Sequence, residues 1–404
     1  MKITAVKTVL LTGPCTNDPY LSEARKRRSA AFVEILTDTE ITGLGETYAG
    51  YFIPEIVPEI VRFFEPILVG QSPEEIDLLW RRMYHCGNFW CRTGVGLQVL
   101  SAIEAALWDI RGKCERLPVY RLLSEVRRES LPCYATGGPA NYPLEKLYRK
   151  LEYYRSLGFT AAKIGAGQFE EGRTRTSRIP EKAAEIEYEK VTAIRRRFGG
   201  EFTLMLDGHM GNWPDFDTVW TLPVARAVMT ALAGSGLLFF EEPLHYNDRE
   251  GYRALRAESP VPIAGGEALA GEAEWEPYYD GCFEIGQPDA AYVGGLSQFL
   301  RIARSLDRRG SRIATHSWAA GGGFMQNIHA GFAAPNTEIL EIAPDYGPLH
   351  SEIIGESFRM EGGRVLPPET YGLGITLSEK VREKYPFLPG SGEFNSVPGK
   401  ILRD

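Results

Sequence analysis

Three short hydrophobic runs between Phe202 and Glu267 each end in an acidic residue. Asp207 follows FTLML, Glu241 follows LLFF, and Glu267 follows PIAGG. The gaps between these acids are 34 and 26 residues, about the length of one strand–helix–strand unit. Short apolar runs bounded by turn residues are typical of strands that are buried on both faces, as in a parallel sheet. The pattern therefore predicts successive parallel strands, each with a carboxylate at its end.

The three carboxylates indicate a metal site if they meet at one rim of a barrel. The C-terminal rim is where barrel enzymes carry their reactive residues. Clustered carboxylates repel one another unless a cation lies among them, and hard oxygen ligands suit Mg²⁺ or Mn²⁺. We therefore expect Asp207, Glu241 and Glu267 to bind a divalent ion, Mg²⁺ with Mn²⁺ as the alternative. The competing interpretation is three solvated loop acids.

From residue 131 onward, strand-like runs alternate with helix-like segments. We expect strands at 131–136, 161–166, 203–208, 237–242, 262–267, 284–293, 312–317 and 339–343. Several of the segments between them have helical periodicity and close on Gly, as helices often do. Eight such units predict an α/β fold of the (β/α)8, or TIM-barrel, type or a close variant.

The chain on either side of the predicted barrel has a different character. Residues 1–50 alternate like a small antiparallel sheet, and helical patterns follow to about residue 125. We therefore expect an N-terminal α+β domain at 1–125 and the barrel at 126–358. The Pro/Gly-rich segment 359–404 is expected to pack back on the N-terminal domain.

Composition argues against several classes of function. The formal net charge over 404 residues is −8, and the basic run at 25–28 is too short for a nucleic-acid surface. Six scattered cysteines without a Cys-x-x-Cys pair are typical of reduced thiols. No signal-peptide pattern is present, and no apolar run approaches the roughly 20 residues of a membrane span. We expect a soluble, cytoplasmic protein that binds neither nucleic acid nor membrane.

More polar residues lie at predicted strand ends. Asp289, His316 and Glu341 follow Glu267 at successive intervals of 22, 27 and 25 residues. Neighbouring strands would place His316 beside Asp289, and a carboxylate on one imidazole nitrogen raises the basicity of the other. Taken alone, His316 would be read as a structural histidine, but this setting favours an acid–base pair. Lys163, in the apolar run AAKIGA, must either reach the rim or serve the site.

His209 lies two residues after Asp207. Positions two apart on a strand face the same side, so we expect His209 to point where Asp207 points. The alternative is a turn histidine bonded to the backbone. We interpret the remaining histidines as structural or surface residues: His85, His245, His329 and His350.

Seven motifs in order give the chain a resemblance to a known family. They are SAIEAALWDIRGK, GFTAAKIG, LDGH, FFEEPL, AGGEAL, QPDAAYVGG and ATHSW, and they span nearly the whole chain. Together they resemble the enolase superfamily, mandelate racemase-like subgroup. The resemblance implies a modified TIM barrel with an N-terminal α+β capping domain, and a homo-oligomer, either a dimer or an octamer.

The resemblance also implies roles for the residues at the strand ends. One Mg²⁺ per chain would lie on Asp207, Glu241 and Glu267. His316 and Asp289 would form an acid–base pair, and Glu341 would hydrogen-bond the substrate carboxylate. The loops around 13–28 and 48–52 would close over the site and select the substrate. Candidate pocket residues are Tyr48, Tyr51, Trp90, Arg92 and Trp318.

One departure from the family pattern bears on the reaction. Many members carry a second lysine two residues after the first, as a base opposite the histidine, but here that position is Gly165. Racemisation by two opposed bases is therefore not expected. A histidine just after the first metal ligand, as His209 is here, is similar to members that dehydrate sugar acids.

We therefore expect a lyase, a Mg-dependent carbon–oxygen hydro-lyase acting on an aldonate or aldarate sugar acid. His316 would remove the proton α to the carboxylate, and the metal and Lys163 would stabilise the enediolate. His209, or His316 once it is protonated, would give a proton to the departing β-hydroxyl, and loss of water would yield a 2-keto-3-deoxy acid. The alternatives are a cycloisomerase or epimerase of a sugar acid or lactone, and a non-catalytic barrel that binds a metal or a sugar acid.

Overall fold

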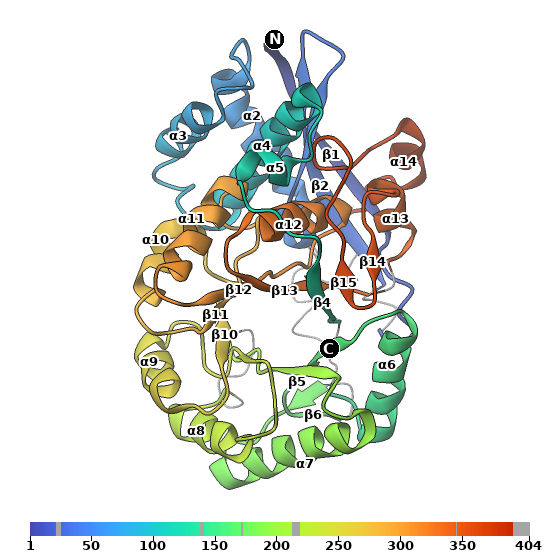
Figure 1. The fold of residues 1–404 in the computed structure, drawn as a ribbon. Helices are drawn as coiled ribbons and strands as arrows, with labels where there is room; N and C mark the ends of the chain where they lie inside the picture. The colour runs from blue at the N-terminus through green and yellow to red at the C-terminus, as the bar shows by residue number, and fades with distance from the viewer. Residues whose placement is uncertain (22–25, 138–140, 171–172, 212–218, 345, 391–404) are drawn as a thin grey trace.

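The computed structural model describes residues 1–21, 26–137, 141–170, 173–211, 219–344 and 346–390. In this part of the chain, a ring of helices surrounds a closed barrel, and a three-stranded antiparallel sheet with its own helices lies against one side of the ring (Figure 1). The predicted TIM-type barrel and the predicted N-terminal α+β architecture are both confirmed.

Eight parallel strands close the barrel in the order β13-β12-β11-β10-β9-β8-β5-β4, and β13 pairs with β4. Their bounds are β4 (Leu131–Ala135), β5 (Ala161–Gly165), β8 (Thr203–Asp207), β9 (Phe240–Glu241), β10 (Ile263–Gly265), β11 (Ile285–Gly286), β12 (Arg312–Ala314) and β13 (Thr337–Ile342). The strand predicted at 284–293 is wrong over most of its length. Pro288 has no N–H for the ladder, and the chain turns at 290–294.

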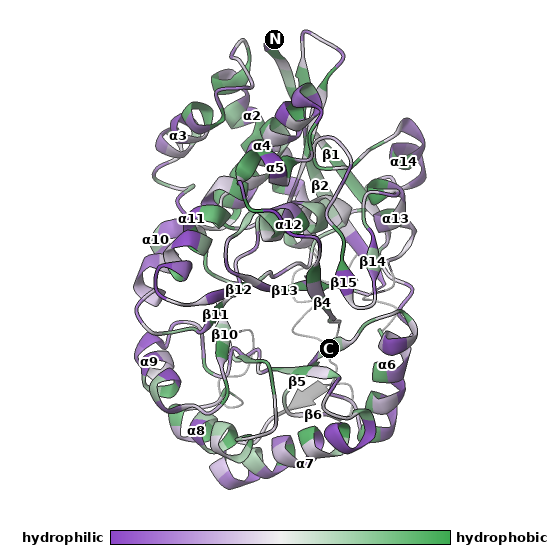
Figure 2. Cartoon of the chain, in the orientation of Figure 1, coloured by the Kyte–Doolittle hydropathy of each residue, from purple (hydrophilic) through white to green (hydrophobic). Residues whose placement is uncertain are grey.

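Helices cover the outside of the barrel between these strands (Figure 1). They are α6 (Leu144–Ser156), α7 (Pro180–Phe198), α8 (Leu222–Ala231), α9 (Arg249–Glu258), α10 (Gly271–Trp275) with the 3-10 turn η3 (Glu276–Tyr278), α11 (Leu296–Asp307), α12 (Gly321–Ala333) and α13 (Pro348–Ile354). Hydrophobic and hydrophilic residues alternate along α7, as expected for a helix with one face on the strands (Figure 2). A short hairpin, β6 (Gln168–Glu170) with β7 (Arg173–Arg175), follows β5.

The N-terminal sheet consists of β1 (Ile3–Pro14), β2 (Arg27–Thr37) and β3 (Thr42–Thr47), paired in that order. Its helices are α1 (Ala49–Phe52), the 3-10 turn η2 (Pro54–Ile56), α2 (Val57–Leu68), α3 (Ile76–Cys86), α4 (Gly94–Glu115) and α5 (Val119–Leu123). The long helix α4 packs on β3 and is buried along most of its length. A helix that is apolar on most sides needs partners on most sides, and α4 has the sheet and the barrel helix α11.

The C-terminal segment contacts both parts of the molecule. Its elements are β14 (Met360–Glu361), β15 (Arg364–Val365) and α14 (Glu379–Lys384), and β15 pairs antiparallel with β4. Further along, Leu11 pairs with Pro386, and Arg382 forms an ion pair with Glu34 of β2. The domain boundaries at 125 and 358 stay predictions, and residues 391–404 lie outside the described part.

Two other expectations concern membranes and thiols. Among the described residues, no helix is both long and apolar enough to span a membrane. All six cysteines are free thiols.

His329 of α12 is buried and held neutral by its neighbours. The backbone N–H of Tyr120 donates to Nδ1 at 3.1 Å, and Nε2 lies 3.3 Å from the carbonyl oxygen of Leu373. Burial lowers the pKa of His329 to about 4. Its stabilising contribution is complete above the unfolded pKa of about 6.5 and is lost as the pH falls towards 4.

We expect this group alone to lower the free energy of unfolding by about 2 kcal/mol between pH 7.5 and pH 5. Urea unfolding of the wild type and of His329→Gln at both pH values measures the difference. Glutamine keeps a donor for the Leu373 carbonyl and removes the titration. His350, whose pKa burial lowers well below its usual value, is present in both proteins and cancels. Equal losses in the two proteins would contradict this account.

Candidate active site

A layer of hydrophobic side chains fills the barrel directly beneath the site. Its buried members are Tyr134, Ala161, Met205, Phe239, Ala264, Ile285, Ala314 and Ile339, one from each strand segment. Positions two residues further along a strand face the same way. Six of the eight segments carry a functional polar residue at that position: Lys163, Asp207, Glu241, Gln287, His316 and Glu341. The strand alternation therefore places these side chains together above the core, at the C-terminal rim.

Glu267 reaches the same rim by a different route. It follows the core residue Ala264 by three positions, so strand alternation alone would turn it away. The preceding Gly266 has φ 112°, and a Cβ there would lie 2.3 Å from the ring of Trp275. This left-handed turn, which needs glycine, redirects the chain. Glu267 then lies 3.6 Å from Nε2 of His316 and 3.9 Å from Nε2 of His209.

Lys163 is buried among three carboxylates. Its Nζ lies 2.7 Å from both carboxylate oxygens of Glu241 and 3.2 Å from an oxygen of Asp207 and of Glu341. Burial opposes a charge on Lys163, but the three carboxylates outweigh it and raise its pKa well above the usual value. Lys163 is therefore a fixed cation.

His316 is held from behind by Asp289. Its Nδ1 lies 2.9 Å from Oδ2 of Asp289, which is fully buried. Asn327 of α12 donates from Nδ2 to the other oxygen of Asp289 at 2.8 Å. Burial opposes protonation of the ring, but Glu267, Asp289 and Glu341 raise the pKa of His316 to about 10. The predicted pair is thus brought together, with Nε2 directed to the site.

His209 also contacts the strand-end acids. We predicted the direction of His209 from the alternation of side chains along a strand. Strand β8 ends at Asp207 and His209 has φ 54°, so this alternation does not extend to His209. The left-handed conformation turns the ring back, and Nδ1 lies 3.1 Å from Oδ2 of Asp207. Partial burial opposes a charge on the ring, but Asp207 and Glu267 raise the pKa of His209. Half of its side-chain surface is exposed, so it can reach a molecule above the rim.

The strand-end acids form the candidate donor set for a divalent cation. Among the described residues, no three His, Cys, Asp or Glu side chains converge to hold a metal ion as they stand, and both oxygens of Glu241 are bonded to Lys163. The charge balance nevertheless favours a cation. Six acids surround one lysine and two histidines: Asp207, Glu241, Glu242, Glu267, Asp289 and Glu341.

Buried oxygens and shifted pKa values support the same conclusion. Oδ1 of Asp207 is buried without a hydrogen-bond partner among the described residues, as are both carboxylate oxygens of Glu242. Burial and Asp207 raise the pKa of Glu241 well above its usual value. Burial and Glu267 raise that of Glu242 to about 8. Excess buried negative charge with a bare carboxylate oxygen fits a hard divalent ion.

Asn141 packs beside Gly165, the position at which this sequence lacks the second lysine. A Cβ on Gly165 would lie 3.4 Å from Cβ of Asn141, whose Nδ2 donates to the carbonyl oxygen of Ala166 at 2.9 Å. Asn141 is buried and cannot act as a base. This geometry removes the opposed base that two-base racemisation needs.

Three of the five predicted pocket residues lie beside His316. The Tyr48 and His316 ring centroids are 5.7 Å apart, and Nε1 of Trp318 donates to the hydroxyl of Tyr51 at 2.8 Å. Segment 48–52 therefore covers this side of the site. In the other predicted covering loop, 13–28, Arg28 donates to the carbonyl oxygen of Ala319 at 2.7 Å, and residues 22–25 lie outside the described part.

Trp90 and Arg92 are not brought to the site. Trp90 packs on Phe63 and Phe64 of α2, with ring centroids 5.1 and 5.7 Å apart. Arg92 lines a cavity on the outside of the barrel together with Trp80 of α3. Both lie in the turn between α3 and α4, and their residue types alone could not show which way this turn faces.

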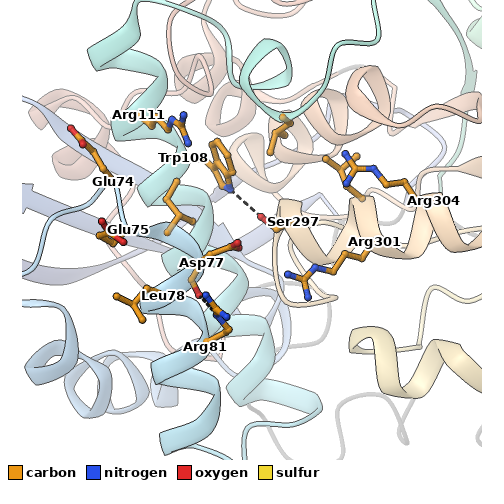
Figure 3. Close-up of a pocket in the computed structure, with 13 residues that line it drawn as sticks. Glu74, Glu75, Asp77, Leu78, Arg81, Trp108, Arg111, Ser297, Arg301 and Arg304 are labelled. Atoms are coloured by element: carbon orange, nitrogen blue, oxygen red, sulfur yellow. Dashed lines mark hydrogen bonds between the residues drawn. The ribbon is translucent and has the colours of Figure 1, made fainter.

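A second cavity, of about 450 Å³, lies between α3, α4 and α11 (Figure 3). Arg81, Arg111, Arg301 and Arg304 line it, and Trp108 donates to Ser297 on its wall. None of the predicted site residues line this cavity.

Sequence reasoning missed several residues that the structure places in or behind the site. Nε2 of Gln287 donates to Glu241 at 2.6 Å, and Glu242 and Asn327 were not singled out either. The signal for Gln287 was present, since it lies two residues before Asp289 in the same motif. Asn327 gave no signal, because it lies mid-helix, 38 residues from Asp289.

The chain matches known proteins over nearly its whole length. Residues 13–124 match the mandelate racemase/muconate lactonizing enzyme N-terminal domain, and residues 146–381 match the enolase C-terminal domain-like family. An arabinonate dehydratase from Saccharolobus solfataricus is 29% identical over 87% of this chain and 89% of its own. A D-galactarolactone cycloisomerase from Agrobacterium fabrum is 29% identical over 94% of this chain and 97% of its own.

Solved structures agree with these matches. The crystal structure of L-talarate dehydratase from Polaromonas sp. JS666, complexed with Mg and L-glucarate, has a TM-score of 0.79 at 26% identity. The match covers 96% of this chain and 98% of that one. The chain therefore belongs to the mandelate racemase/muconate lactonizing enzyme subgroup of the enolase superfamily, and it is an enzyme.

Proposed function

We propose that this enzyme dehydrates a sugar acid, an aldonate or aldarate, to a 2-keto-3-deoxy acid. The observation that carries the proposal is the pair of imidazoles on either side of Glu267, His316 at 3.6 Å and His209 at 3.9 Å. Dehydration needs a base for the α-proton and an acid for the β-hydroxyl, and two imidazoles can supply both. Relatives named arabinonate dehydratase and L-talarate dehydratase support the substrate class.

His316 is the proposed base. Its Nδ1 is bonded to Asp289, so Nε2 is the nitrogen that takes the proton from the carbon next to the substrate carboxylate. Glu267 is the largest of the charges that raise the pKa of His316, so a cation held by Glu267 would lower that pKa and leave Nε2 unprotonated. Electrons from that C–H bond form the enediolate, whose negative charge Lys163 offsets. Glu341, whose Oε1 lies 3.2 Å from Nζ of Lys163, is the proposed hydrogen-bond partner of the substrate carboxylate.

The second half of the reaction breaks the bond to the β-oxygen. The enediolate electrons move to form the C–C double bond, and the hydroxyl leaves with a proton from His209 as water. The resulting enol takes a proton at the β-carbon, loses the proton of its own hydroxyl and becomes the 2-keto-3-deoxy acid. No residue except His316 and His209 is needed to move protons.

Asp207, Glu241 and Glu267 are the proposed ligands of one Mg²⁺ per chain, with Mn²⁺ as the alternative. When bound, this ion supplies positive charge to the substrate carboxylate as the negative charge develops. The side chains of Glu241 and Lys163 must separate for this, because Lys163 holds both oxygens of Glu241. A homo-oligomeric, cytoplasmic enzyme is part of the same proposal.

The alternative is a cycloisomerase, which the relative named D-galactarolactone cycloisomerase favours. It would use the same α-proton abstraction but expel a ring oxygen in place of water. A two-base epimerase needs a second base opposite His316, and in the described part of the chain neither Gly165 nor Asn141 beside it can supply one.

Proton NMR in D₂O with Mg²⁺ tests the proposal against a pooled library of aldonic and aldaric acids and their lactones. The expected result is a deuterated 2-keto-3-deoxy acid, formed from one library member. Ring opening without loss of water would establish the cycloisomerase. Exchange of the α-proton with inversion at that carbon, in an acid that is otherwise unchanged, would establish an epimerase. It would also contradict the conclusion that Gly165 leaves the enzyme without a second base.

His209→Asn should separate the two halves of the reaction. We expect loss of water to slow by about 10²–10⁴-fold, because the leaving hydroxyl has no proton donor. Exchange of the α-proton of the same substrate should persist within about tenfold, because His316 is untouched. The NMR experiment above measures both rates in one sample.

His245→Asn is the matched control for this prediction. His245 follows the acid-ended strand β9, accepts a hydrogen bond from the backbone N–H of Asn247, and has no part in the proposed proton transfers. The control should retain both rates. Unchanged water loss in His209→Asn, with normal Mg²⁺ content, would remove His209 from the acid role.

A further inference from the structure

The loops that carry Asp289 and His316 are held by the N-terminal sheet. His316 lies between β12 and α12, and Asp289 lies between β11 and α11. Both loops end at the N-terminus of a helix that meets the N-terminal domain. The side chain that makes this contact at α12 is Glu46 of β3, which is buried to 2% exposure.

Glu46 binds the first turn of α12 through both carboxylate oxygens. The backbone N–H of Ala320 donates to one oxygen at 2.8 Å, and that of Gly323 donates to the other at 2.7 Å. The N–H of Glu46 itself donates to Oε1 of Gln326 at 2.7 Å. The first two bonds satisfy N–H groups at the start of α12 that have no partner within the helix, and the negative charge suits the helix N-terminus.

Close packing makes this contact specific. A Cβ on Gly322, the middle glycine of Gly321–Gly323, would lie 2.6 Å from the ring of Phe32 and 2.8 Å from Cβ of Glu46. Only glycine lets the sheet approach the helix this closely. The glycine and the carboxylate thus fix one position of α12 against β3.

From α12, the contact continues to the acid–base pair. Asn327, one turn further along the helix, donates from Nδ2 to Oδ1 of Asp289 and accepts from the N–H of Ala290, both at 2.8 Å. The other oxygen of Asp289 contacts Nδ1 of His316 at 2.9 Å. Asn327 therefore fixes Asp289 from two directions, and Asp289 fixes the imidazole.

We propose that Glu46 and Asn327 are positioning residues, which together transmit the docking of the N-terminal domain on α12 to the orientation of His316. The proposal rests on His316 being the base of the proposed function. Neither residue touches the substrate, so both act through Asp289. The N-terminal domain is then more than a lid, because it also sets the geometry of a group on the barrel.

Burial of Glu46 is consistent with this role. Burial raises its pKa to about 7, although the N–H groups of Gly323 and Ala320 and the charge of Arg28 lower it. A buried carboxylate is weak evidence for stability, since apolar residues of the same volume often stabilise as well. Its presence here fits a need for one defined helix position.

Hydrogen exchange measured by mass spectrometry tests the proposal without any substrate. In Glu46→Gln, Gly322→Ala and Asn327→Leu, we expect backbone amides of 287–293 to exchange at least about tenfold faster than in the wild type. Tyr48, two residues after Glu46, also donates directly from its backbone N–H to the carbonyl oxygen of Ala291 at 3.2 Å. Gly322→Ala and Asn327→Leu leave that bond in place, so faster exchange in these two variants reports transmission through α12. Gly322→Ala changes no polar group and should still give the same result as Glu46→Gln.

Asp109→Asn is the matched control. Asp109 of α4 is also a buried carboxylate that accepts two backbone N–H groups, from Leu44 at 2.9 Å and Leu373 at 2.7 Å. It joins the sheet to the C-terminal segment, whose Leu373 carbonyl oxygen lies 3.3 Å from Nε2 of His329 on α12, but it bonds neither the first turn of α12 nor Asn327. The control should lose stability, but its exchange in 287–293 should stay within about threefold of the wild type.

Kinetics supply the second readout. With the acid that the library experiment identifies, kcat should fall about 10–100-fold in Glu46→Gln and Asn327→Leu, with KM and Mg²⁺ affinity within about threefold. Faster exchange confined to 317–323 in Glu46→Gln would overturn the proposal, as would unchanged kcat in Asn327→Leu. If the wild type turns over no acid, the proposed function fails and the exchange result alone decides the positioning role.

Discussion

Replacing His316 with Asn is expected to stop exchange of the substrate α-proton. The amide keeps a donor towards Asp289, at a position where the two groups are 2.9 Å apart, so the fold should be preserved. It has no nitrogen that can accept a proton in place of Nε2. Loss of a positioned base costs typically 10²–10⁴-fold, and we expect both exchange and product formation to fall by about that factor. Proton NMR in D₂O measures both.

The comparison with His209→Asn makes this result specific. His316→Asn should lose exchange and dehydration together, whereas His209→Asn should lose dehydration alone. Magnesium content must be equal in the two proteins, because Glu267 lies close to both rings. Normal exchange of the α-proton in a His316→Asn protein with full magnesium content would show that His316 is not the base.

Most of the site could be predicted because it follows from strand alternation. Lys163, Asp207, Glu241 and Glu341 each lie two residues after an inward-facing core residue on a parallel strand. A sequence with hydrophobic runs at the right spacing already contains this information. Asp289 was predicted on a strand that ends three residues earlier, yet its contact with His316 stands, because β11 and β12 are neighbours.

The rest depends on tertiary contacts that leave no local pattern. Glu46 meets Gly323 across 277 residues, and no periodicity connects an acid on an edge strand with a distant helix. Trp90 and Arg92 have the chemistry of pocket residues, but the turn that carries them faces α2 and the outer cavity. We predicted the position of Glu267 correctly, but strand alternation does not explain it. The left-handed conformation of Gly266 turns the chain so that Glu267 reaches the rim.

Replacing Lys163 with Met is expected to destabilise the metal-free protein by about 3–5 kcal/mol, because removing one partner leaves buried charges uncompensated. Lys163 lies within 3.2 Å of carboxylate oxygens of Asp207, Glu241 and Glu341. Methionine fills a similar volume, so the loss of stability reflects uncompensated charge and not a cavity. Urea unfolding in EDTA, compared with the wild type, measures it.

Magnesium should reverse much of this loss. In the wild type the ion must compete with Lys163 for Glu241, whereas in Lys163→Met Glu241 loses both bonds to the lysine and keeps the one from Gln287. A ligand that binds only the folded state stabilises it by RT ln(1 + [L]/Kd), so tighter binding gives a larger gain. We therefore expect Mg²⁺ to raise the free energy of unfolding more in Lys163→Met than in the wild type.

Lys190→Met is the control for a buried lysine outside the cluster. Lys190 binds Glu187 at 2.8 Å and the carbonyl oxygens of Gly165 and Gly167, so its loss should also destabilise the protein. The substitution leaves no group of metal ligands behind, so Mg²⁺ should stabilise Lys190→Met no more than it stabilises the wild type. Equal gains from Mg²⁺ in Lys163→Met and in the wild type would mean that the strand-end acids do not share one cation. The lysine would then be their permanent counter-charge, and the metal would have to bind elsewhere.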